Sequence, residues 1–138
     1  NPQHTFYCIE PMPWMMPADP DQYLWLIKVV DREHFAVHMD LANWITSPIK
    51  YLQNEQFIDE IFDKLGGYIK SCHLKNVHLA NEFTLQLKEV ACEAGELNLN
   101  YYVEHANRID LEMPMIIEHL HTDEEYIASM EWVKANIS

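Results

Sequence analysis

Three carboxylates and one imidazole stand at or just after the ends of short apolar runs, at Glu10, Asp40, His73 and Glu118. Gathered at one point, these acids would repel one another strongly, and a divalent cation relieves such repulsion. Oxygen-rich ligation with one nitrogen suits Mn²⁺ or Mg²⁺ better than it suits a structural zinc ion. Zn²⁺ and Co²⁺ are the alternative metals for such a site. The four residues therefore predict one divalent metal site, against the alternative that each is an ordinary cap or loop residue.

The apolar runs have the length of buried strands. We predict strands at 5–9, 35–39, 68–72 and 115–117, and a further strand with period-two alternation at 84–90. Because short apolar strands separated by helices are typical of a parallel sheet covered by helices, the predicted fold class is α/β. The carboxyl ends of parallel strands share one edge of a sheet, and this edge would gather the four ligand-type residues.

Helical periodicity and capping residues predict the segments between the strands. Asp19 and Pro20 begin one helix, Asn54 caps a second that ends at Gly66, and a third lies near 100–109. Thr122 opens a capping box and a last helix. The apolar side expected for that last helix consists of Tyr126, Ile127, Met130 and Val133.

Strand parity gives a test of this arrangement. Successive strand residues point to opposite faces, so His38 should share the face of Asp40. Met39 and Cys72 should then pack outward, against the helices.

Five segments resemble the successive strand-end motifs of the sugar phosphate isomerase/epimerase family, the xylose-isomerase-like TIM barrels that also include endonuclease IV. They follow one another in the order that the family has and cover essentially the whole chain. The segments are CIEPMPW (8–14), VHMDLAN (37–43), SCHLKNV (71–77), EAGELN (93–98) and IIEHL (116–120).

The resemblance implies a metal held by Glu10, Asp40, His73 and Glu118, with Glu10 and Glu118 as the catalytic acid and base on opposite faces of the substrate. The implied reaction is a sugar isomerisation or epimerisation, in which a proton moves at a carbon next to a metal-chelated carbonyl or hydroxyl. The residues assigned to substrate binding are His38, Asn43, Lys75 and Trp14.

Alternatives remain open for three of these assignments. His38 is otherwise a hydrogen-bonded interior histidine, Lys75 an offset to the carboxylates, and Trp14 a cover of the barrel mouth. Asn43 stands where the epimerases of this family have a histidine. Departures at Asn76, where the family has aspartate, and at Leu79, where it has a substrate-binding arginine, leave the sugar unidentified and do not support a phosphorylated one.

Charge and hydropathy narrow the function class. Nine Lys and Arg against 22 Asp and Glu give a net charge of −13, which argues against a nucleic-acid or anionic-membrane surface and against an endonuclease IV-like phosphodiesterase. No apolar stretch approaches the ~18 to 20 residues of a membrane helix. We expect a cytoplasmic metal-dependent enzyme with a small sugar or sugar derivative as its substrate. Besides the endonuclease IV-like phosphodiesterase, the alternative to this enzyme is a non-catalytic barrel remnant.

The length predicts an incomplete barrel. A full (β/α)₈ barrel needs about 250 residues, and the chain has 138. We therefore expect residues 1–138 to form one domain, the C-terminal portion of a TIM barrel with about five parallel strands and its N-terminal strands absent. Because such a sheet has open edges, we expect self-association or a complementing N-terminal barrel segment.

Overall fold

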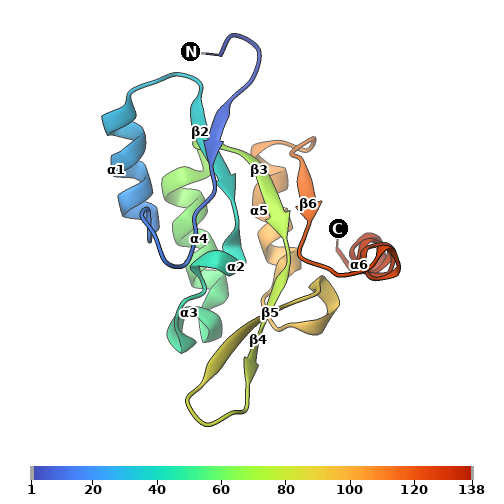
Figure 1. Ribbon diagram of the computed structural model, residues 1–138. Helices are drawn as coiled ribbons and strands as arrows, with labels where there is room; N and C mark the ends of the chain where they lie inside the picture. The colour runs from blue at the N-terminus through green and yellow to red at the C-terminus, as the bar shows by residue number, and fades with distance from the viewer. Residues whose placement is uncertain (1, 138) are drawn as a thin grey trace.

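The computed structural model describes residues 2–137 of the chain, which form a mixture of strands and helices (Figure 1). The strands are β1 (Tyr7–Ile9), β2 (Phe35–Met39), β3 (Ile69–Leu74), β4 (Asn76–Ala80), β5 (Gln86–Val90) and β6 (Met115–Ile117). The helices are α1 (Pro20–Val30), α2 (Leu41–Trp44), α3 (Pro48–Leu52), α4 (Asn54–Leu65), α5 (Leu99–Ile109) and α6 (Asp123–Asn136), with short 3₁₀ turns at Gly66–Tyr68 and Cys92–Ala94.

Four strands form a parallel sheet in the order β1-β2-β3-β6. Its register pairs Cys8 with Ala36, His38 with Ser71, and His73 with Ile116. All four carboxyl ends consequently lie at one edge of the sheet, and the predicted α/β class is confirmed.

The prediction that residues 84–90 form a strand of the parallel sheet is wrong. This segment is β5, which pairs antiparallel with β4 in a separate two-stranded sheet, and Val77 lies opposite Glu89. Antiparallel strands need only a short loop between them, whereas a parallel connection needs a crossover, usually a helix. Because β4 and β5 form an antiparallel hairpin, the sequence before residue 84 shows no helical pattern. The parallel sheet has four described strands, and the hairpin lies beside its carboxyl edge.

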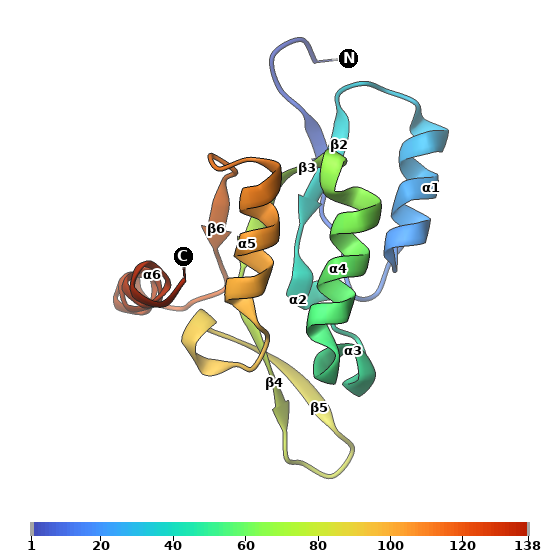
Figure 2. The ribbon, with the colours of Figure 1, turned by 180° about the vertical axis from the view of Figure 1, so that it is seen from behind.

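Helices α1, α4 and α5 cover one face of the parallel sheet (Figure 2). An apolar stripe of α4 is buried against this face, from Phe57 through Ile61 to Leu65. The side chain of Tyr23 on α1 is also buried, and its hydroxyl lies 2.5 Å from the carbonyl oxygen of Ile9 and 3.1 Å from that of Ala36. This contact fixes the relative position of β1 and β2 just below their carboxyl ends.

Side-chain parity agrees with the prediction. Met39 and Cys72 are fully buried in the core, whereas His38 and Ser71 are half-buried and join each other through a 2.5 Å contact between Nδ1 and Oγ. Burial raises the pKa of the Cys72 thiol to about 11, which suits a packing role and not a nucleophile.

Two details of the helices differ from expectation. The segment after Asp40, where no helix is predicted from the sequence, forms the short helices α2 and α3, each with a side-chain N-cap and too brief to show periodicity. The expected apolar side of α6 is exposed at Tyr126, Ile127 and Met130, whereas its fourth member, Val133, is half-buried and packs against the core beside Trp132. Ser129 is the buried residue of this helix. None of the described helices combines the length and the apolar character needed to cross a membrane.

Candidate metal centre

The carboxyl edge of the parallel sheet brings together the four residues that the sequence singled out. Glu10, Asp40 and Glu118 follow β1, β2 and β6 directly, and His73 lies near the end of β3. One ligand atom from each of the four lies within 4.8 Å of the others. Their convergence follows from the parallel topology, because each strand delivers its last residues to the same edge.

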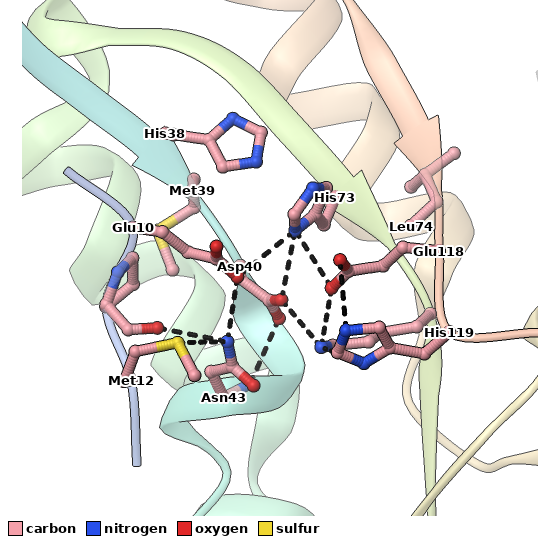
Figure 3. Close-up of polar contacts among 12 residues, drawn as sticks. Glu10, Met12, His38, Met39, Asp40, Asn43, His73, Leu74, Glu118 and His119 are labelled. Atoms are coloured by element: carbon pink, nitrogen blue, oxygen red, sulfur yellow. Dashed lines mark hydrogen bonds and ion pairs between the residues drawn. The ribbon is translucent and has the colours of Figure 1, made fainter. Parts of the chain in front are cut away.

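The Nδ1 atom of His73 lies at the middle of this group (Figure 3). It is 2.9 Å from Glu118 Oε1, 3.2 Å from Glu10 Oε1 and 3.3 Å from Asp40 Oδ2. One ring nitrogen carries at most one hydrogen, so it cannot satisfy three carboxylates by hydrogen bonding. Such spacings match the edges of a coordination shell with metal–ligand bonds of about 2.1 Å, and three oxygens with one nitrogen suit a hard divalent cation. The donor set therefore fits a metal.

Asp40 is the most deeply buried member of the group. Its side chain is inaccessible to solvent, and Oδ1 caps α2 by accepting a hydrogen bond from the backbone N–H of Asn43 at 3.0 Å. Burial alone would raise the pKa of Asp40, but the contact with His73 and the ammonium of Lys75 outweigh it and hold the pKa well below its usual range. Asp40 is thus anionic, with Oδ2 directed at the other members of the group.

Asn43 holds Glu10 in place. Its buried Nδ2 atom donates to Glu10 Oε1 at 3.0 Å and to the carbonyl oxygen of Pro11 at 3.1 Å. Both amide hydrogens therefore have protein acceptors. The predicted contact between Asn43 and substrate stays a prediction.

Lys75 supplies a buried cation to the same cluster. Only 3% of the residue is exposed, and Nζ lies 2.9 Å from Asp40 Oδ2, 2.6 Å from Glu118 Oε1 and 2.9 Å from Glu89 Oε2. Although burial lowers the pKa of a lysine, the charge of Asp40 and the three carboxylate contacts raise that of Lys75 above its ordinary value. Lys75 offsets the carboxylates, one of the two roles considered from the sequence.

Glu89 and His119 complete the surroundings of Glu118. Glu89 Oε1 lies 2.7 Å from His119 Nδ1, and His119 Nε2 lies 3.5 Å from Glu118 Oε2. Glu89 is not among the site residues predicted from the sequence, because it lies in the β4–β5 hairpin and not at the end of a strand of the parallel sheet. The signal that points to it in the sequence is Lys75, because a lysine beside strand-end carboxylates attracts a further acidic residue.

The remaining predicted site residues lie around this group. The ring of His38 packs edge-on against that of His73 with centroids 4.1 Å apart, and Glu10, His38 and His73 form a second set of close ligand atoms. Burial lowers the pKa of His38, and the neighbouring His73 lowers it further. Trp14, in the loop between β1 and α1, is 76% exposed. The substrate-binding roles of His38 and Trp14 stay predictions.

Lys75→Met should tighten the binding of Mg²⁺ about tenfold, a change of about 1.4 kcal/mol. The ammonium contacts Asp40 Oδ2 and Glu118 Oε1, two of the oxygens assigned to the metal, so the two cations compete for them. Isothermal titration calorimetry of the wild type and the variant measures the difference. Lys88→Met removes an exposed hairpin lysine that pairs with Glu82 and serves as the control. Unchanged or weaker binding in the Lys75 variant would contradict the competition.

The chain matches no protein-family model and no curated protein, but solved structures share its fold. A xylose isomerase-like TIM barrel protein from Mycobacterium smegmatis in complex with magnesium is 17% identical, with a TM-score of 0.68 over 96% of this chain and 45% of its own. The probable 3-DHS dehydratase of petrobactin synthesis from Bacillus anthracis is 16% identical, with a TM-score of 0.68 over 96% of this chain and 50% of its own. A D-tagatose 3-epimerase-like protein is 15% identical, with a TM-score of 0.62 over 91% of this chain and 44% of its own.

The chain spans half or less of the length of each of these structures, while nearly all of its own length aligns with them. This agrees with the four-stranded parallel sheet, which is half the strand number of a complete (β/α)₈ barrel. At these identities the likeness concerns the fold. The resemblance inferred from the strand-end motifs is confirmed at that level: the chain has the fold of a portion of a xylose isomerase-like TIM barrel.

Proposed function

We propose that the protein takes part in a divalent-metal-dependent isomerisation or epimerisation of a small sugar or sugar derivative. The observation that carries the proposal is the convergence of Glu10, Asp40, His73 and Glu118, whose ligand atoms lie within 4.8 Å of one another at the carboxyl edge of the sheet. Active sites of TIM barrels lie at this edge. The magnesium complex and the epimerase-like protein among the structural neighbours support the choice of cofactor and reaction.

The four residues would hold Mg²⁺ or Mn²⁺, and Zn²⁺ or Co²⁺ is a weaker fit to the three oxygens. A divalent cation supplies polarisation of a substrate carbonyl and hydroxyl, which acidifies the neighbouring C–H group. Asp40 and His73 contribute fixed ligand positions, because α2 and the sheet hold both side chains. These two residues have no proton-transfer role in the proposal.

Glu10 and Glu118 are the proposed acid and base. One carboxylate takes a proton from the carbon beside the carbonyl, the electron pair spreads into an enediolate, and the other carboxyl group returns a proton to the opposite face. Burial raises the pKa of Glu10, and the charge of Asp40 raises it further against the lowering effect of His73. Lys75 donates to Glu118 at 2.6 Å and orients it.

Metal binding and turnover test this proposal together. We expect one equivalent of Mn²⁺ to bind in a calorimetric titration, and Mn²⁺-loaded protein to exchange the proton at the reacting carbon of at least one ketose in a panel assayed in D₂O by NMR. EDTA should abolish the exchange, and fresh Mn²⁺ should restore it. Saturation with metal but no exchange with any ketose would favour the non-catalytic barrel remnant. Failure to bind metal would contradict the proposed function altogether.

A further inference from the structure

A cavity of about 340 Å³ adjoins the metal centre. Its walls come from the loop after β1, from α2 with the residues that follow it, and from the β4–β5 hairpin, and they include Asn43, Thr46, Leu87 and Glu89. Two of these touch the cluster directly: Asn43 donates to Glu10, and Glu89 contacts Lys75. A substrate whose reacting end lies at Glu10 and Glu118 would therefore place its other end in this cavity.

Among the residues that line the cavity, Glu89 of the hairpin is the only charged one. Leu87 and Glu89 both line the cavity because they lie two positions apart on β5 and share one face. The nearest buried cation, Lys75, is 3% exposed and already contacts three carboxylates, so it offers little to a ligand anion. The wall is thus mostly apolar, with Asn43 and Thr46 as its neutral polar residues and Glu89 as its one charge.

We infer that Glu89 is a specificity-determining residue, which excludes substrates that carry an anionic group at the end away from the reacting carbon. The inference rests on the proposed function. Phosphate or carboxylate in the cavity would face the Glu89 carboxylate, and none of the residues that line the cavity is a cation. Hydroxyl groups, in contrast, can donate to Glu89 and exchange hydrogen bonds with Thr46. The hairpin, which is not part of the parallel sheet, thereby sets the class of ligand that the centre accepts.

The test compares two ligands that differ by one phosphate group, D-fructose and D-fructose 6-phosphate. Their affinities are measured by isothermal titration calorimetry at low ionic strength, because salt screens the effect. Wild-type protein should bind D-fructose more tightly than D-fructose 6-phosphate. Glu89→Gln keeps the size of the side chain and removes its charge, and it should shift the affinity ratio toward the phosphate by about tenfold.

Glu82→Gln is the matched control. Glu82 lies in the loop between β4 and β5, pairs with Lys88 and does not line the cavity, so the same change of charge should leave the ratio unaltered. Tighter binding of the phosphate by wild-type protein, an equal shift in both variants, or binding of neither ligand would overturn the inference. Titrations with and without Mg²⁺ separate the two proposals: loss of metal binding contradicts the proposed function, whereas the ligand ratio tests Glu89.

Discussion

Glu118→Gln is expected to lower kcat for the ketose reaction about 1000-fold at saturating metal, because general acid–base catalysis typically contributes 10²- to 10⁴-fold. Glutamine keeps the Oε1 acceptor that contacts Lys75 at 2.6 Å and His73 at 2.9 Å, so the fold should survive. What the variant loses is the ability to take up and return a proton. The measurement is steady-state turnover with Mn²⁺ at several concentrations, together with a thermal unfolding curve.

The dependence on metal concentration separates two effects in this variant. A weaker ligand is compensated by more Mn²⁺, whereas a missing acid–base group is not. Glu112→Gln serves as the control, because Glu112 is exposed, precedes β6 at its opposite end and undergoes the same change of charge. Full activity of the Glu118 variant at high Mn²⁺ would remove Glu118 from proton transfer and leave it as a ligand only.

The residues of the candidate metal centre could be located from the sequence because parallel strands impose a simple rule. Glu10, Asp40, His73 and Glu118 each stand at or just after the end of an apolar run, and parallel strands place such ends together whatever the details of the helices. The same rule places Met39 and Cys72 in the core. Local pattern and strand parity were sufficient for both.

The partners of these residues could not be located in the same way. Glu89 reaches Lys75 from a hairpin whose antiparallel pairing leaves no signature that distinguishes β5 from an alternating strand of the main sheet. The contacts of the Asn43 amide with Glu10 and Pro11 were not predictable from the sequence either. Both contacts depend on where loops and short helices lie in space, and periodicity carries no information on that.

Asn76 is a further residue whose role only the structure explains. It stands where the related motif has an aspartate, and it is almost fully buried at the start of β4. Its Oδ1 accepts from the backbone N–H groups of Val77 and Leu97, both at 2.8 Å, and its Nδ2 donates to the carbonyl oxygens of Cys92 and Leu97. The amide thus ties the hairpin to the segment that precedes α5.

Gly95 allows this contact. A Cβ atom on Gly95 would lie 2.5 Å from Asn76 Cγ, which is closer than two carbon atoms can approach. The segment 92–97 therefore closes tightly around the Asn76 side chain. A side chain of the same size without the Nδ2 donors loses the hydrogen bond to the carbonyl oxygen of Cys92.

Asn76→Asp is accordingly expected to lower the free energy of unfolding by about 3–5 kcal/mol at neutral pH, since a buried carboxylate without a cation is added and two donor contacts are lost. Urea denaturation followed by circular dichroism measures the change. Burial would raise the pKa of the new carboxyl group in the folded state, so the deficit should shrink as the pH falls and the group is protonated. Asn81→Asp, the same substitution at an exposed position just beyond β4, should change stability by less than about 0.5 kcal/mol. Equal stability of the two variants would show that the amide of Asn76 is not what joins the hairpin to α5.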